Sequence, residues 1–313
     1  MDLHRFAFST QSYSRHPLKK VLKRIAKTGF KGVEISADKP HLWLDQLPLK
    51  EASRLSKQLE KLDLFVSTID ATCTTGYWSD APAERLSEPS LISRNNTLRE
   101  WRIAYTKKAL RLAREIGVDA VTVSSGKLLN GITPEKAQRL LHDSLSRLLE
   151  LAEHLGQRIA FVCEPSHYIE STSELSALLK SFNSAYLGAC LNVGHAEMMG
   201  EDANASIRLV KNRLFHVQLM DVRGRQHYAH VPGDGEIDFR TVFRTLDAVG
   251  YNGPLTWQLA GNSETPDNDC LRALKYVKTL VLERSLNKRP AAVSNSGISK
   301  TKAKSKPSKR IAS

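Results

Sequence analysis

The chain lacks the features that mark secreted, metal-knuckle and membrane proteins. Its 313 residues include four cysteines, Cys73, Cys163, Cys190 and Cys270, and no Cys-x-x-Cys pair. This wide spacing disfavours a disulfide framework or a zinc knuckle and fits reduced thiols. No run of about 18 apolar residues occurs, so we expect no membrane span. The N-terminal MDLHRFAFSTQSY has no apolar signal-peptide core, and we expect a cytoplasmic protein.

Acidic residues are missing from the end of the chain. The formal charge of the whole sequence is +13, and residues 287–313 contribute eight basic side chains and no acidic one. These are Lys288, Arg289, Lys300, Lys302, Lys304, Lys306, Lys309 and Arg310. Subtracting these eight leaves +5 for residues 1–286, so that part is not notably basic. The tail has little to bury, and we predict a disordered basic extension that makes at most weak contacts with nucleic acid.

Short apolar runs alternate with long amphipathic segments through about residue 285. The runs predict eight strands: Phe6–Thr10, Gly32–Ser36, Leu64–Asp70, Ala120–Ser125, Ile159–Pro165, Leu187–Val193, Leu214–Val222 and Pro254–Ala260. The segments between them repeat apolar residues at helical spacing, and several end in glycine. Eight strand–helix units predict one α/β domain over residues 1–286, a (β/α)8 TIM barrel. A doubly wound open sheet is the alternative. No glycine-rich phosphate loop follows the first strand, so we predict no nucleotide cofactor.

One connection is unusually long. Residues 71–96 join the third strand to the next helix and contain Tyr77, Trp78 and Arg94. A long ordered loop at the carboxyl face of a barrel often serves as a lid or a substrate-binding element. An ordinary surface insertion fits the composition equally well.

Polar side chains gather where the predicted strands end. Because these ends meet at one face of a barrel, their side chains form a candidate site, although any single one could be a structural residue. The candidates are Glu34, Asp70, Glu164, His167, Asn192, His195, His216, Gln218, Asp221, His230 and Gln258.

Four sequence blocks resemble one known family over about residues 4–285. They are CEP at Cys163–Pro165, LNVGH at Leu191–His195, HVQLMDV with HVPGDGEIDF at 216–239, and GYNGPLTWQL at Gly250–Leu259. They are similar to the strand-five to strand-eight motifs of the sugar phosphate isomerase/epimerase-like barrels, also called xylose isomerase-like or AP endonuclease family 2 barrels.

The resemblance implies a site for one divalent cation, Mn²⁺, Mg²⁺ or Co²⁺. The family's Glu, Asp, His and Glu ligands correspond here to Glu164, Asn192, Gln218 and Gln258. Three of these four positions are substituted by amides, and the formal charge of the site falls from −3 to −1. Hard cations are held largely by carboxylate charge, so we expect weak or absent binding there. A weaker, displaced site built from Glu164, His195, His216 or Asp221 remains an alternative.

The resemblance also implies proton transfer next to a carbonyl group of the substrate. Gln258 cannot take a proton, which leaves Glu164 as a single base, with His195 as a second catalytic residue that donates to the developing oxyanion. The remaining candidates would contact the substrate: His167, His216, Asp221, Arg223 and His230.

Three functions remain open. The first is a carbohydrate-type isomerase, epimerase or related lyase that acts on a small polyhydroxylated sugar or cyclitol with an altered metal site. The second is a pseudoenzyme or partner subunit that binds a sugar-like ligand. The third, a DNA-repair endonuclease, would need about three metals and more His and Asp ligands than the chain has. A homo-oligomer is compatible with each.

Overall fold

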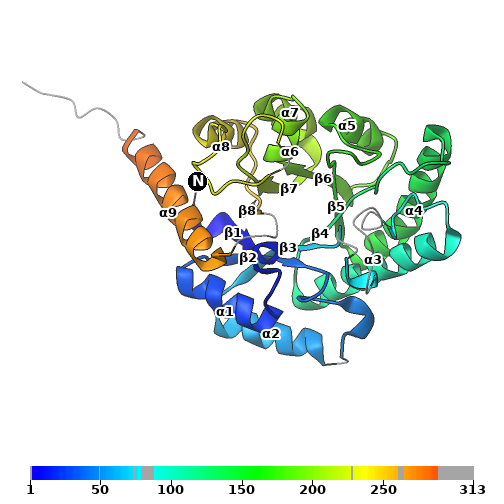
Figure 1. The fold of residues 1–313 in the computed structure, drawn as a ribbon, viewed down its shortest axis with the longest axis horizontal. Coiled ribbons are helices and arrows are strands. Elements are labelled where there is room, and N and C mark those ends of the chain that lie inside the picture. The colour runs from blue at the N-terminus through cyan, green and yellow to red at the C-terminus, as the bar shows by residue number, and fades with distance from the viewer. Residues whose placement is uncertain are drawn as a thin grey trace, which may run out of the picture.

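Eight parallel strands close into one barrel in sequence order (Figure 1). The computed structural model describes residues 2–48, 50–72, 75–78, 88–226, 228–259 and 264–287. The strands are β1 Phe6–Ser9, β2 Gly32–Ser36, β3 Phe65–Asp70, β4 Ala120–Val123, β5 Arg158–Val162, β6 Leu187–Asn192, β7 Leu214–Leu219 and β8 Leu255–Trp257. Pairing of Phe6 with Leu255 joins β1 to β8 and completes the closure. The predicted (β/α)8 barrel is confirmed, and the open-sheet alternative is wrong.

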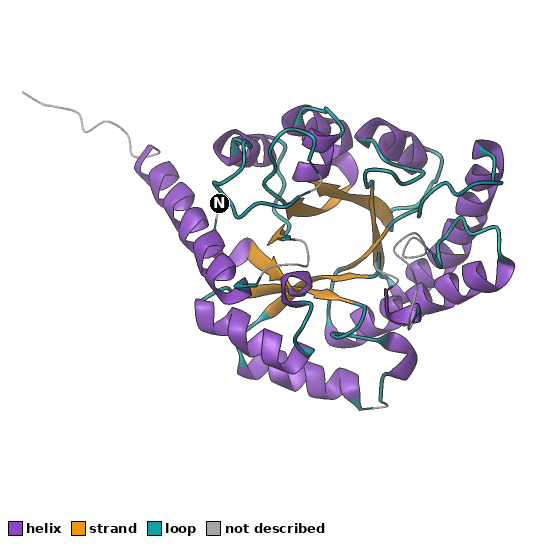
Figure 2. Cartoon of the chain, in the orientation of Figure 1, coloured by secondary structure: helices purple, strands orange, loops and turns teal. Residues whose placement is uncertain are grey.

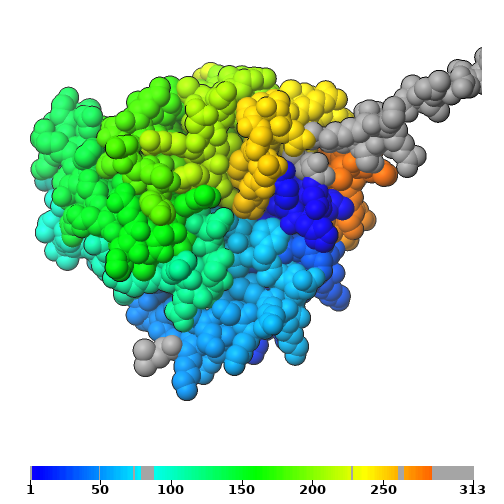
Figure 3. All heavy atoms as spheres, turned by 180° about the vertical axis from the view of Figure 1, so that it is seen from behind, coloured from blue at the N-terminus to red at the C-terminus, as the bar shows by residue number. Residues whose placement is uncertain are grey.

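Helices surround the barrel as an outer ring (Figure 2). They are α1 Leu18–Thr28, α2 Glu51–Lys61, α3 Asn96–Ile116, α4 Pro134–Leu155, α5 Thr172–Lys180, α6 Val193–Met198, α7 Ala203–Val210, α8 Phe239–Ala248 and α9 Pro266–Asn287. Glycines end several of them as expected: Gly29 follows α1 in the left-handed conformation, with φ of 104°, which side chains with a Cβ rarely adopt. The last helix packs beside the first elements of the chain (Figure 3).

Strands in a closed barrel are covered on both faces, so they read as continuous apolar runs rather than as alternating ones. All six residues of β6 are buried, and so are all four of β1. Phe6 and Phe8 of β1 and Trp257 of β8 are fully buried. This packing fixes the strands, and the polar residues at their carboxyl ends are held on a rigid frame.

The Gly-Tyr-x-Gly block lies at the opposite, amino end of the barrel. The hydroxyl of Tyr251 donates to the carbonyl oxygen of Pro254 over 2.7 Å. A Cβ on Gly253 would lie 2.6 Å from that hydroxyl, so the position needs glycine. Arg5, just before β1, donates to the carbonyl oxygens of Tyr251 and Gly253. The block therefore fastens β8 to β1 and takes no part in the candidate site.

Some predictions fall outside the described residues. The basic tail does so from residue 288 onward, as do Cys73 and most of the residue 73–87 stretch of the long connection. The cysteines of the described part are buried free thiols. Within that part, each helix is too short or too polar to cross a membrane. The boundary between residues 286 and 287 and the cytoplasmic location stay predictions.

Candidate active site

Three amide side chains meet at the carboxyl ends of β6, β7 and β8. Asn192 Nδ2 donates to Gln258 Oε1 over 2.9 Å and to Gln218 Oε1 over 3.4 Å. We call these three residues the amide cluster. Asn192 Oδ1 accepts the backbone N–H of His195 over 3.1 Å and so caps the start of α6. Three of the four positions that the resemblance assigns to metal ligands are therefore joined to one another by hydrogen bonds.

The hydrogen bonds of the amide cluster run outward to two buried carboxylates. Gln218 Nε2 donates to Glu34 Oε2 of β2 over 2.9 Å. Gln258 Nε2 donates to Gln11 Oε1 over 3.3 Å, and Gln11 Nε2 donates to Asp70 Oδ2 of β3 over 2.5 Å. These directions fix which end of each amide is oxygen and which is nitrogen. Gln11, which follows β1, was missed by the sequence analysis because no motif marks it.

Beneath the amide cluster lies a fully buried pair, Glu34 and His216. His216 Nε2 is 3.4 Å from Glu34 Oε2, and neither side chain is exposed. Within the described part of the chain, Glu34 Oε1 and His216 Nδ1 have no hydrogen-bond partner. Burial and the charge of Glu34 raise the pKa of Asp70 to about 8. His216, predicted to contact substrate, thus lies deep in the barrel, away from solvent.

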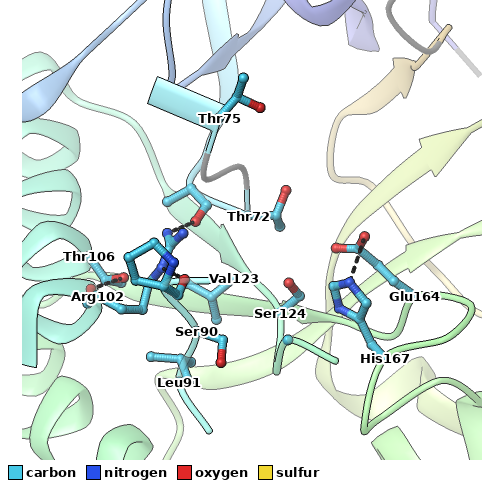
Figure 4. A pocket seen from close by; sticks show the side chains of 13 residues that line it. Thr72, Thr75, Ser90, Leu91, Arg102, Thr106, Val123, Ser124, Glu164 and His167 are labelled. Carbon is cyan, nitrogen blue, oxygen red and sulfur yellow. Dashed lines mark hydrogen bonds and ion pairs between the residues drawn. The ribbon is translucent and has the colours of Figure 1, made fainter. Parts of the chain in front are cut away.

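A cavity of about 210 Å³ opens at the ends of β3, β4 and β5. Its polar lining includes Thr72, Arg102, Ser124, Glu164 and His167. Figure 4 shows Arg102 on one side of the cavity and Glu164 with His167 on the other. His167 Nε2 lies 3.8 Å from Glu164 Oε2. Two predicted site residues, Glu164 and His167, are therefore brought together in a space that can hold a small molecule.

Arg102 of α3 supplies a buried positive charge to the cavity. It is 4 % exposed. Its Nε donates to the carbonyl oxygen of Pro89 over 2.9 Å and its Nη1 to that of Ala71 over 2.8 Å. These carbonyls hold the guanidinium in place, and its charge also lowers the pKa values of the nearby Asp38 and Glu88 carboxyls, which burial raises. The sequence analysis missed Arg102, because it occupies a position on the buried face of an amphipathic helix.

Asp221 organises the loop after β7. Its Oδ2 accepts the backbone N–H groups of Gly233, over 2.8 Å, and Gly235, over 2.9 Å, while Oδ1 accepts that of Ile237 over 3.2 Å. A Cβ on Gly235 would lie 2.1 Å from Asp221 Oδ1. This contact explains the Pro-Gly-x-Gly motif: its glycine lets the backbone approach the carboxylate. Asp221 is buried, and these contacts give it a structural role in the loop.

The other predicted contacts do not line the cavity. The exposed side chain of Arg223 donates from Nε to the carbonyl oxygen of Asp234 over 2.8 Å. His230 is half-buried and packs edge-on against Tyr228. His195 is 8 % exposed, and its Nδ1 lies 3.4 Å from the carbonyl oxygen of Cys163. Of these, His195 is the one whose ring lies against Cys163, the residue that precedes Glu164.

The residues proposed for a displaced metal site are kept apart. Among the residues that the structure describes, no three His, Cys, Asp or Glu side chains converge where they could jointly hold a metal ion. Asp221 is bound to its loop, and His216 is paired with Glu34 below the amide cluster. The alternative site of Glu164, His195, His216 and Asp221 therefore does not form in this structure.

A closed parallel barrel with a polar cavity at the carboxyl ends of its strands is a (β/α)8 barrel, a fold in which active sites lie at this face. Residues 22–280 match the family model of the xylose isomerase-like TIM barrel. The chain belongs to this family, as the four sequence blocks predicted.

Individual relatives are distant. An inosose dehydratase of Clostridium beijerinckii is 24% identical over 282 residues, which span 82% of this chain and 87% of that protein. Among solved structures, a D-tagatose 3-epimerase-like protein superposes with a TM-score of 0.75 at 20% identity, covering 90% of this chain and 99% of the other. The IOLI protein with a bound zinc atom gives a TM-score of 0.71 at 17% identity over 89% of this chain and 98% of its own. These structures establish the fold.

Proposed function

We propose that the protein moves a proton next to the carbonyl group of a small polyhydroxylated ketone, with Glu164 as the base. The observation that carries this proposal is the position of Glu164 on the wall of the cavity, opposite the charge of Arg102. A carboxylate is a suitable acceptor for a carbon-bound proton, and a fixed cation stabilises the enolate oxygen that develops. A cavity of about 210 Å³ has room for one sugar-sized molecule.

The hydroxyl side chains that line the cavity support a polyhydroxylated substrate. Hydroxyl side chains of Thr72, Thr75, Ser90 and Ser124 line it together with Glu164. Hydroxyl groups both donate and accept hydrogen bonds, which suits a ligand covered in hydroxyl groups. The inosose dehydratase relative acts on a cyclitol ketone by its name, and the D-tagatose 3-epimerase-like fold neighbour on a sugar by its own. A sugar or cyclitol ketone is the class we propose for this chain.

The residues at the family's metal positions do not fit a divalent cation. Asn192, Gln218 and Gln258 are neutral, and their donors and acceptors are engaged with one another and with Glu34 and Gln11. A cation there would meet an N–H group of Asn192 where its relatives would offer a carboxylate. Glu164, the fourth position, alone brings a negative charge. We therefore propose that the amide cluster takes the structural place of the metal ion, and we derive no step through a metal.

His195 remains the predicted second catalytic residue. Its ring is set against the carbonyl oxygen of Cys163, the residue before Glu164. The resemblance implies that it donates to the oxyanion of the substrate. Because His195 does not line the described cavity, this role stays a prediction. A homo-oligomer and a cytoplasmic location also remain part of the proposal.

The test measures proton exchange. Inosose and D-tagatose are incubated with the purified protein in D₂O, and loss of the signal of the hydrogen next to the carbonyl is followed by NMR. We expect exchange with at least one of them, and a loss of roughly 10²–10⁴-fold in the Glu164→Gln variant. The matched control is Glu115→Gln, because Glu115 is an exposed carboxylate on the outer side of α3. Exchange that survives Glu164→Gln would overturn the assignment of the base.

A second candidate is a pseudoenzyme or partner subunit that binds a sugar-like ligand. The amide cluster favours it, because satisfied hydrogen bonds among three amides form a stable substitute for a catalytic metal centre. This candidate predicts that calorimetry detects binding of inosose or D-tagatose while no proton exchange occurs. Exchange that depends on Glu164 would reject it.

A further inference from the structure

The short turn after β5 places two proton-transfer groups side by side. It runs through Glu164, Pro165, Ser166 and His167, and is closed by a hydrogen bond from His167 N to the carbonyl oxygen of Glu164 over 3.0 Å. Proline in the second position and a positive φ in the third are typical of a type II turn. The turn directs both side chains to the same wall of the cavity (Figure 4).

This turn is strained at Ser166. Its φ is 67°, which lies in a region that favours glycine. Among the non-glycine residues that the structure describes, Ser166 and Asp63 are the two with a positive φ. Such a conformation costs on the order of 1–3 kcal/mol and is found where a site needs a particular geometry. The backbone N–H of Ser166 donates to Glu170 Oε2 over 3.1 Å, which helps hold the turn. The result is that His167 Nε2 stays 3.8 Å from Glu164 Oε2.

On the opposite wall of the cavity, the described residues offer no side chain that could act as a base. Among the described residues that line the cavity, the ionisable ones are Arg102, Glu164 and His167. Arginine stays protonated in proteins and cannot serve as a base. Gln258, which stands where the family has a second carboxylate, cannot take a proton either. Inversion of a carbon centre requires groups on its two faces, and here both groups act from one face.

We propose that Glu164 and His167 form a one-sided acid–base pair that removes water from a β-hydroxy ketone, so that the chain is a dehydratase rather than an epimerase. This inference rests on the proposed function of Glu164 as the base. His167 was expected to contact substrate, and the proposal makes it the general acid.

The steps balance within the pair. The Glu164 carboxylate takes the proton from the carbon next to the carbonyl, and the C–H electrons form the enolate. The carbonyl then re-forms, a C=C bond appears between the neighbouring carbons, and the C–O bond of the β-hydroxyl breaks with its electrons. Protonated His167 gives its proton to the leaving hydroxyl, which departs as water. A proton passing from Glu164 to His167 restores both groups, with no oxidant or reductant involved.

The His167→Gln variant tests the acid–base pair separately from the role of Glu164 as the base. In the His167→Gln variant we expect exchange of the proton next to the carbonyl of inosose in D₂O to stay within about tenfold of wild type, because Glu164 is intact. Dehydration, followed by the ultraviolet absorbance of the conjugated product, should fall roughly 10²–10⁴-fold. His142→Gln is the control for losing a histidine, since His142 is exposed on α4 and stacks on Phe182 away from the cavity.

The outcomes distinguish the two claims. Two results would overturn the acid–base pair and leave Glu164 as the base. One is that wild type exchanges the proton in a Glu164-dependent way but inverts the configuration of the carbon. The other is that His167→Gln dehydrates inosose at the wild-type rate. If wild type exchanges no proton of inosose or D-tagatose, the proposed function is overturned and the pair with it. Circular dichroism spectra and urea unfolding curves of His167→Gln that match those of wild type exclude misfolding as the cause of the lost dehydration.

Discussion

Asn192 on β6 donates a hydrogen bond from Nδ2 to Gln258 Oε1, which follows β8, over 2.9 Å. The same nitrogen also reaches Gln218 on β7. An NH₂ group therefore lies between the ends of three strands, at the positions where the resemblance implies metal ligands. We propose that this arrangement takes the structural place of a metal ion, and that the chemistry takes place in the cavity beside Glu164.

Removing the centre of the amide cluster should destabilise the fold. Asn192→Ala leaves the oxygen of Gln258 and the N–H of His195 without their partners in a buried site. We expect a loss of about 1–3 kcal/mol in the free energy of unfolding, measured by urea denaturation. Asn252→Ala, at an exposed position, is the control and should change it by less than about 0.5 kcal/mol. Equal effects of the two variants would show that the hydrogen bonds of the cluster add no stability.

Asp70 should make the fold less stable as the pH rises. Burial and the nearby charge of Glu34 raise its pKa from 3.8 to about 8 in the folded protein. The unfolded chain releases this proton near pH 4, whereas the folded protein keeps it until about pH 8. The contribution of Asp70 to the free energy of unfolding is therefore greatest below pH 4 and is lost progressively between pH 4 and 8.

The Asp70→Asn variant isolates that contribution. An amide has no proton to lose, so the curve of unfolding free energy against pH should be flatter between pH 5 and 8 than in wild type. Parallel curves for the two proteins would mean that Asp70 is already ionised at neutral pH.

The loop after β7 should depend on the glycine beside Asp221. Gly235→Ala introduces a Cβ 2.1 Å from Asp221 Oδ1 and 2.7 Å from the carbonyl oxygen of Val222. The loop must shift, and we expect a loss of roughly 1–3 kcal/mol with faster proteolytic cleavage near residues 223–236. Gly117→Ala is the comparison: no atom lies within 4 Å of its Cβ, so it carries only the strain of a φ of 74°. If cleavage is unchanged in Gly235→Ala, Asp221 does not hold the loop.

The fold followed from the sequence because closed-barrel strands are apolar on both faces and leave clear runs. Strand ends were less certain: the run predicted as Ile159–Pro165 forms β5 at Arg158–Val162, since Glu164 and Pro165 belong to the turn. That one shift matters, because it moves Glu164 from a strand onto the loop that also carries His167.

The site was only partly predictable. Glu164 and His167 follow a strand, and this position predicted that they lie at the face where the structure has the cavity. Arg102 could not be found in this way, because its partners Ala71 and Pro89 are far from it in sequence and its helix position is typical of core residues. For Asp221 the sequence motif predicted a contact with substrate. In the structure its carboxylate accepts hydrogen bonds from three backbone N–H groups of the loop instead.

Titration with Mn²⁺ by calorimetry tests the central claim most directly, comparing wild type with the variant Asn192→Asp/Gln218→His/Gln258→Glu. The variant restores two carboxylates and an imidazole at the family's ligand positions, beside Glu164. We predict stoichiometric binding to the variant and none at micromolar Mn²⁺ to wild type. Stoichiometric, tight binding of Mn²⁺ to wild type would contradict the account, because the amide cluster could not then stand in the place of the metal.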